Sequence, residues 1–373
     1  MIRTVQRLSN SWWTRTGVGA LAISIAAAST SVAVAAPPDS KYLLVGSTTS
    51  STVGVLRLNA DGSPTRIGTQ PTGLGTQSLI VAQDGRTVFV SHGVNRAISR
   101  YRFDSEGRMT PLPGGQTPLD GSPITIIGTR DSRYVFAGIA GAPGHISTFA
   151  VGPTGELRRI HRNVLIEGLT ALTMLTVDPD NRFLRVVSYL DNSVQTFRIG
   201  GDGSLTRVQR PVPTGRGPVN PGYTPDGRYF YVAHEQSGDV HSYRIGVNGA
   251  LTPIGSNPFS GPVSHQAVVS ADGKRMYVPN TFGGTVSGFN IRPGGRLAAM
   301  PGSPFPVPGG PMPILVVLHP NGRSLYAVDM VAAGGVAKVH QMAVRPDGTL
   351  HATGHSADAV SGMVDGPVAQ IVG

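Results

Sequence analysis

Cysteine is absent from all 373 residues of the sequence. Disulfide bonds, cysteine nucleophiles and thiolate metal sites are therefore excluded, and stability must come from core burial and strand pairing. Charge is also sparse, because only 14% of the residues are acidic or basic. The formal net charge is +10, but the basic residues are dispersed along the chain rather than clustered, so we expect no nucleic-acid partner.

The first 35 residues contain no acidic side chain and carry Arg3, Arg7 and Arg15 around the start of an apolar run, residues 17–36. Small residues at positions 33 and 35 of this run suit a signal peptidase, so we predict a Sec-type signal peptide over residues 1–35 and a mature domain over 36–373. Cleavage would lower the net charge from +10 to +7, because it removes three arginines and no acid. A retained membrane anchor is the alternative, since the run is close to membrane-spanning length. After cleavage we expect a secreted or extracytoplasmic protein of the cell envelope with no membrane span.

Helical periodicity is absent after this leader, and the 50 glycines and 30 prolines punctuate short apolar runs at regular intervals. An Asp-Gly or Asn-Gly turn recurs in most units, as at Gly203 and Gly249. Each unit therefore reads as four short antiparallel strands, which is typical of a propeller blade. A basic residue precedes the second strand of every unit, at spacings of 45 to 49 residues: Lys41, Arg86, Arg133, Arg182, Arg228, Lys274 and Arg323.

We therefore predict an all-β fold, a seven-bladed β-propeller of four-stranded blades in one domain. After the leader the repeats begin at a second strand, "KYLLVG", whereas residues 366–373, "GPVAQIVG", resemble the first strand of the other units. The C-terminal strand should complete the first blade and close the ring, which removes free sheet edges.

Two repeat positions place polar side chains at strand ends that we expect to converge on one face of the channel. Six residues after the basic marker stand residues such as His92, His234 and Asp329, and Glu235 comes directly after His234. The starts of the innermost strands contribute a further set: Gln77, Asn220, His265 and Gln266.

Hydrolysis of a carboxylic ester needs a base that activates water and a donor that stabilises the oxyanion. We assign the catalytic role to Glu235 with His265 or His234. Substrate binding is assigned to the other members of the set: Asn220, as the donor, with His92, Asp329, Gln77 and Gln266. The same histidines could instead shuttle protons in a cycloisomerase.

Structural roles are the alternative for each of these residues, because polar side chains at strand ends often bond to loop backbone. A metal site made by His92, His265 and Asp329 is conceivable, but no local ligand spacing supports it. We expect no metal and no cofactor.

Several motifs resemble the lactonase-type seven-bladed propellers, the relatives of bacterial 6-phosphogluconolactonase and fungal carboxy-muconate cyclase. They are the seven-unit count, the turn-and-strand element "PDGRYFYV", the "DGSL" hairpin and "PGSPF" at 301–305. The unit "YVPNTFGGTVSGFNI" also resembles the YVTN-type repeat. The resemblance covers essentially the whole mature chain and implies a site between blades and channel.

In that family the site is expected to hold a histidine, an Arg-His pair after Gly-x-Gly-Pro, a glutamate and a further arginine. Here the Gly-x-Gly-Pro is residues 215–218, and Val219 and Asn220 follow it. Glu235 stands at the glutamate position, whereas residues 280–281 replace the further arginine and Ala171 stands near the histidine. The resemblance thus implies that Glu235 is retained and that most of the family's site residues are replaced.

Two functions remain open at this point, beside a third in which the chain is a scaffold of the YVTN surface type. The chain is either an exported lactonase-family hydrolase that hydrolyses or isomerises a small lactone or carboxylate at the channel mouth, or a non-catalytic propeller of the cell envelope that binds a ligand or a protein. The partner is accordingly a small lactone or carboxylate in the first case, and an envelope ligand or protein in the second.

Overall fold

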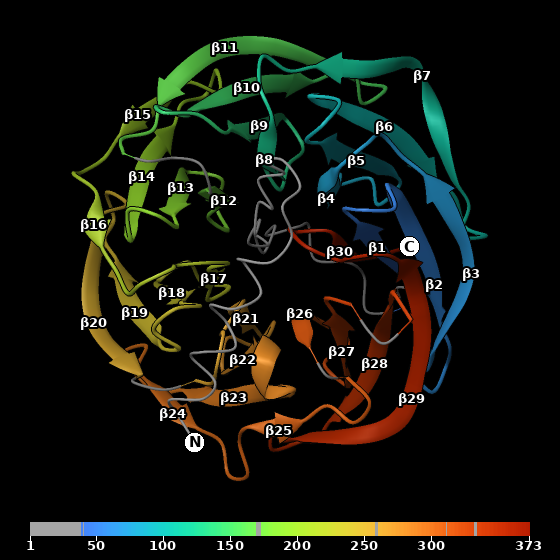
Figure 1. Cartoon of the computed structure of the whole chain (residues 1–373). Coiled ribbons are helices and arrows are strands. Elements are labelled where there is room, and N and C mark those ends of the chain that lie inside the picture. Colours follow the sequence, from blue (N-terminus) through green and yellow to red (C-terminus); the bar gives the residue numbers. More distant parts are fainter. Residues whose placement is uncertain (1–38, 40, 169–172, 258–259, 311, 332–333) are drawn as a thin grey trace, which may run out of the picture.

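The computed structural model describes residues 39, 41–168, 173–257, 260–310, 312–331 and 334–373. The predicted signal peptide, residues 1–35, lies outside these ranges. Within them the chain forms seven antiparallel sheets that follow one another around a ring (Figure 1). The described residues include one short helical turn, η1 (Thr281–Gly283), and no helix long and apolar enough to cross a membrane. The predicted seven-bladed propeller is confirmed.

Each blade is a meander whose second strand is the most buried, and blades 1 to 3 show the pattern. The strands of blade 1 are β1 (Tyr42–Ser47), β2 (Thr52–Leu58), β3 (Pro64–Pro71) and β30 (Ala369–Val372). Those of blade 2 are β4 (Thr76–Val81), β5 (Thr87–His92), β6 (Ala97–Phe103) and β7 (Met109–Pro118). Those of blade 3 are β8 (Pro123–Gly128), β9 (Tyr134–Ile139), β10 (His145–Val151) and β11 (Leu157–Leu165).

Blades 4 to 7 follow the same meander, and blades 4 and 6 have a fifth short strand that pairs with their third strand. Blade 4 contains β12 (Thr173–Val177), β13 (Phe183–Ser188), β14 (Ser193–Ile199), β15 (Leu205–Arg207) and β16 (Val212–Pro213). Blade 5 contains β17 (Gly222–Tyr223), β18 (Tyr229–Ala233), β19 (Val240–Ile245) and β20 (Leu251–Asn257). Blade 6 contains β21 (Val268–Val269), β22 (Arg275–Asn280), β23 (Thr285–Ile291), β24 (Leu297–Ala299) and β25 (Phe305–Pro306). Blade 7 contains β26 (Pro313–Leu318), β27 (Ser324–Asp329), β28 (Val336–Val344) and β29 (Leu350–Ser361).

The ring closes as the sequence predicts. Strand β30 pairs with β1 in antiparallel register, from Tyr42 opposite Val372 to Val45 opposite Ala369. Figure 1 shows this red strand beside the blue β1, next to blade 7. The inner edge of blade 1 is thus paired, and no blade is left one strand short.

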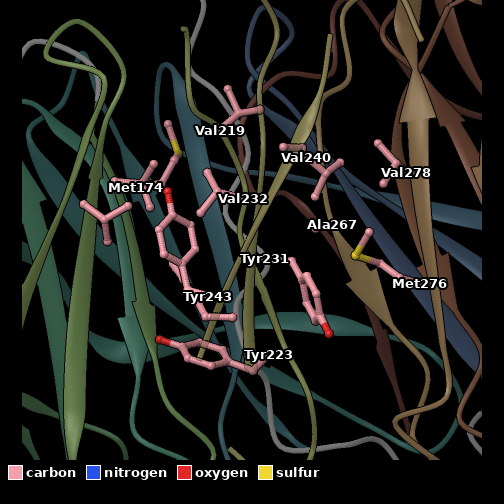
Figure 2. Packing of buried hydrophobic residues seen from close by; sticks show 14 of the residues in the cluster. Met174, Val219, Tyr223, Tyr231, Val232, Val240, Tyr243, Ala267, Met276 and Val278 are labelled. Carbon is pink, nitrogen blue, oxygen red and sulfur yellow. The ribbon is translucent and has the colours of Figure 1, made fainter. Parts of the chain in front are cut away.

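The core lies between neighbouring blades. Figure 2 shows one cluster in which Met174 of blade 4, Tyr231 of blade 5 and Met276 of blade 6 pack together. Tyr231 and Met276 come from second strands, and all three side chains have no exposed surface. Burying a side chain of this size stabilises the fold by roughly 1.5–3 kcal/mol. The apolar runs of the repeats therefore form the contacts between blades.

Tyrosine hydroxyls add a polar contact between blades at a repeated position. The hydroxyl of Tyr231 donates to the carbonyl of Gly295 in the next blade at 2.9 Å. Tyr277 donates in the same way to Gly348 at 2.8 Å, and Tyr326 of blade 7 reaches Gly62 of blade 1 at 2.9 Å. We call these three hydrogen bonds the tyrosine links. Each joins a buried second strand to the hairpin turn of the neighbouring blade.

Candidate functional site

The strand-end position six residues after the basic marker points into its own blade. Nε2 of His92 bonds Oγ of Ser99 on β6 at 2.8 Å, and Nε2 of His340 on β28 bonds Oδ2 of Asp329 at 2.9 Å. Both strand-end side chains are fully buried. The structure therefore does not bring His92 or Asp329 into contact with Glu235 or His265, contrary to the expected convergence at the channel.

His234 follows the same rule and turns away from its neighbour Glu235. Its Nδ1 lies 2.9 Å from Oδ1 of Asp239, and its Nε2 lies 2.7 Å from Oγ1 of Thr214. The backbone N–H of Gly215 also donates to Nε2, at 3.0 Å. Among the described residues no hydrogen bond or ion pair joins His234 to Glu235, whose carboxylate contacts His265 and Tyr189 instead. His234 is thus not placed to act with Glu235.

Glu235 and His265 form a buried pair between blades 5 and 6. Oε1 of Glu235 lies 2.6 Å from Nδ1 of His265, and the two side chains are 7% and 2% exposed. Glu235 follows β18, and His265 precedes β21 with its N–H bonded to the carbonyl of Pro279. A carboxylate this close to one ring nitrogen holds the imidazole in one orientation. The predicted pairing of these two residues is present.

Tyr189 and Asn220 hold the two members of this pair from outside. The hydroxyl of Tyr189, at the end of β13 in blade 4, donates to Oε2 of Glu235 at 3.0 Å. Burial, and then the negative charge of Glu235, raise the pKa of Tyr189 to about 12, so the phenol stays protonated at neutral pH. Nδ2 of Asn220 donates to the backbone carbonyl of His265 at 2.8 Å. Asn220, the expected oxyanion donor, thus uses one of its two N–H groups to position His265.

The second ring nitrogen of His265 has no such partner. Nε2 is buried and makes no hydrogen bond to any residue in the described ranges. Buried polar atoms without partners are rare in folded proteins and often mark positions where a ligand or reacting group binds. With Nδ1 held by Glu235, Nε2 is the nitrogen that remains for proton transfer.

The two glutamines take separate structural positions. Oε1 of Gln266 accepts the backbone N–H of Val316 at 2.8 Å, which ties blade 6 to blade 7. Gln77 lies at the start of the inner strand of blade 2, with an Oε1 that is buried without a hydrogen bond to a described residue. Neither side chain has a described hydrogen bond or ion pair with the pair Glu235–His265.

Tyr189 is the residue of this site that our selection from the sequence missed. A signal existed, because Tyr189 occupies in blade 4 the repeat position that Glu235 occupies in blade 5, seven residues after the basic marker. The sequence favours the charged side chain, Glu235, as the catalytic group at this position and gives the phenol of Tyr189 no role. The hydrogen bond between them crosses from one blade to the next, which a repeat alignment does not reveal.

His92 provides a pH-dependent prediction. Burial lowers its pKa from 6.5 to about 4. Between these two pH values the His92 imidazole is protonated in the unfolded chain but not in the folded chain. The free energy of unfolding should therefore fall as the pH drops from about 6.5 towards 4. In urea unfolding at pH 7 and pH 4.5, His92→Gln should lose less stability than the wild type, by up to about 3 kcal/mol. Equal pH dependence of the two proteins would contradict this assignment.

Comparisons with known proteins agree with the fold and with the resemblance seen in the repeats. The family model described as "Lactonase, 7-bladed beta-propeller" matches residues 91–224, a range that includes Tyr189 and Asn220 but ends before Glu235. The 6-phosphogluconolactonase of Enterobacter sp. (strain 638) is 27% identical over 157 residues, which is 42% of this chain and 46% of that protein. The 6-phosphogluconolactonase of Serratia proteamaculans (strain 568) is 28% identical over 179 residues, 48% of this chain and 52% of that protein. The chain thus matches about half the length of these curated relatives.

Solved structures share the whole ring. The periplasmic gluconolactonase PpgL of Pseudomonas aeruginosa superposes with a TM-score of 0.72 at 22% identity, covering 89% of this chain and 99% of that chain. A protein from Lactobacillus plantarum superposes with a TM-score of 0.74 at 17% identity, covering 90% and 100%. At such low identity these likenesses show the fold alone. The family model and the curated relatives confirm the resemblance seen in the repeats: the chain is similar to the lactonase-type seven-bladed β-propellers, and the solved structures share its fold.

Proposed function

We propose that the protein hydrolyses a small lactone, with His265 as general base and Glu235 as the carboxylate that orients it. The observation that carries the proposal is the buried 2.6 Å contact between Oε1 of Glu235 and Nδ1 of His265, together with the unpartnered Nε2 of His265. A histidine held by a carboxylate at one nitrogen can accept a proton at the other.

The chemistry follows from that arrangement. Nε2 of His265 removes a proton from water as the water oxygen attacks the lactone carbonyl carbon. The resulting imidazolium is stabilised by Glu235, whose buried charge acts in a medium of low dielectric constant. When the ring C–O bond breaks, the imidazolium returns the proton to the leaving alkoxide, and the product is the open-chain hydroxy acid.

Tyr189 and Asn220 support the pair without taking part in proton transfer. Because the pKa of Tyr189 is raised to about 12, its hydroxyl remains a donor to Glu235 and fixes the position of the carboxylate. Asn220 fixes the backbone of His265. Because these hydrogen bonds hold Glu235 and His265 in position before the reaction, the two side chains need to move less when water attacks.

The substrate is, in this proposal, an unphosphorylated lactone encountered outside the cytoplasm. Support comes from the basic and apolar leader over residues 1–35 and from the periplasmic gluconolactonase with the same fold. Val219, which follows the Gly-x-Gly-Pro motif, is buried and carries no charge that could hold a phosphate.

Turnover by the purified full chain tests the proposal. The panel should contain glucono-δ-lactone, its 6-phosphate, a five-membered aliphatic lactone and muconolactone, followed by acid release at constant pH. Hydrolysis above the spontaneous rate, lost in His265→Gln and retained in His351→Gln at an exposed histidine, is the expected result. A folded wild type that accelerates none of these lactones would contradict the proposal and favour a binding propeller instead.

A further inference from the structure

A cluster of metal-ligating side chains that includes neither Glu235 nor His265 lies at the hairpin that joins β18 to β19. Oδ1 of Asp239 lies 2.9 Å from Nδ1 of His234, and Oδ2 lies 3.0 Å from Nε2 of His241. One donor atom from each of the three residues falls within 4.8 Å of the others. Two imidazoles and a carboxylate form a donor set that suits Zn²⁺.

The repeat accounts for a bonded polar pair at the strand end, but not for all three members of this cluster. The strand registers identify the equivalent positions in other blades. The position of Asp239 is the one opposite the strand-end residue, and the position of His241 lies two residues further along the third strand. In blades 2, 6 and 7 these positions hold Ala97 and Ser99, Thr285 and Ser287, and Lys338 and His340. Among blades 2, 5, 6 and 7, only blade 5 has metal-ligating side chains at all three positions, so the repeat alone does not require them.

The surroundings hold the ligands in place and leave an entry route. His234 has no exposed surface, whereas the side chains of Asp239 and His241 are 15% and 28% exposed. Oγ1 of Thr214 lies behind both rings, 2.7 Å from Nε2 of His234 and 3.4 Å from Nδ1 of His241. An oxygen at the remote nitrogen is the usual second partner of a metal-bound histidine.

We propose that Nδ1 of His234, the carboxylate of Asp239 and Nε2 of His241 bind one Zn²⁺ ion per chain, with a fourth position left to water. Bond lengths of about 2.0–2.2 Å in a tetrahedral site require the present donor separations to widen by a few tenths of an ångström. The partly exposed side chains of Asp239 and His241 would make this adjustment. The sequence alone predicts no metal, because the set His92, His265 and Asp329 comes from separate blades and has no local ligand spacing.

Protons redistribute when the ion binds. The N–H of Gly215 donates to Nε2 of His234, which places the ring proton on Nδ1, facing Asp239. Metal binding at Nδ1 moves this proton to Nε2, where Oγ1 of Thr214 can accept it. The N–H of Gly215 then loses its acceptor, so we expect micromolar rather than nanomolar affinity. All three ligands belong to blade 5, so the bound ion links the end of β18 to β19 within one hairpin.

Calorimetric titration of the full chain, stripped with chelator, with Zn²⁺ alone tests this site. The wild type should bind one ion, and its melting temperature should rise with Zn²⁺ concentration. His241→Ala, at a partly exposed residue, should bind at least about 10-fold more weakly and lose the thermal shift. Asp239→Asn should weaken binding in the same direction, and His351→Ala at an exposed histidine of β29 should bind as the wild type does.

Two outcomes would overturn the proposal. One is a wild type that shows no saturable one-to-one binding, and the other is a His241→Ala protein that binds Zn²⁺ as tightly as the wild type does. The second outcome would locate the ion at other histidines. Neither outcome bears on lactone turnover, because Glu235 and His265 lie outside the cluster.

Discussion

Glu235→Gln is expected to lower kcat/KM for the best lactone substrate by about 10²–10⁴-fold, the range that a positioned acid–base group contributes. The amide keeps the size of the side chain and an oxygen that can accept the Tyr189 hydroxyl. It removes the negative charge 2.6 Å from Nδ1 of His265, so the imidazolium formed during water attack loses its stabilisation. Initial rates against substrate concentration, with circular dichroism to verify the fold, measure the effect.

The double variant Glu235→Gln/His265→Gln makes this prediction sharper. If the two residues act as one unit, the double variant should be no slower than His265→Gln alone, because the unit is already broken. Glu106→Gln, at a glutamate that is 67% exposed, is the matched control and should keep the wild-type rate. Losses that multiply, or a Glu235→Gln protein at full speed, would show that the pair does not function as a unit.

Gly249→Ala should destabilise the ring by about 2–5 kcal/mol, the sum of left-handed backbone strain and overpacking. Gly249 has a φ of +89°, and a Cβ added there would lie 2.7 Å or less from three atoms of the Phe183 ring. Phe183 is fully buried in blade 4, and its ring has no room to retreat. Urea unfolding, read as the shift of the midpoint at unchanged slope, measures the loss.

Gly322→Ala separates the two contributions. Gly322 also has a positive φ, +70°, but a Cβ added there would meet nothing within 4 Å. Its cost should be the backbone strain alone, about 1–2 kcal/mol. If both variants lose the same stability, the contact between blades at Phe183 contributes nothing.

The fold could be predicted from the sequence because its rules are local and repeated seven times. The markers Lys41 to Arg323, the turns such as Gly249 and the closing strand near Ala369 each define an element without knowledge of distant contacts. A repeat also averages over errors, since one degenerate unit does not hide the period. Ring closure then follows from the strand that is missing at one end and present at the other.

The site could be predicted only in part, because side-chain direction depends on single-residue register. The sequence leaves His265 and His234 open as partners of Glu235; the structure places His265 against Glu235, whereas His234 faces Asp239 and His241 in its own blade. His92 and Asp329 share the repeat position of His234 and likewise bond within their blades. The sequence does not distinguish a strand-end histidine that faces the channel from one that faces the next strand. Only the pairing register of the strands determines which way its side chain points.

The tyrosine links imply an order of assembly. Tyr231 and Tyr277 reach forward to turns 64 and 71 residues further along the chain, so each link can form soon after the next blade has been synthesised. Tyr326 instead reaches back across 264 residues to Gly62. Closing so long a loop costs more chain entropy and slows folding. We therefore expect blades to dock progressively as the ribosome releases them, with the junction between blades 7 and 1 forming last.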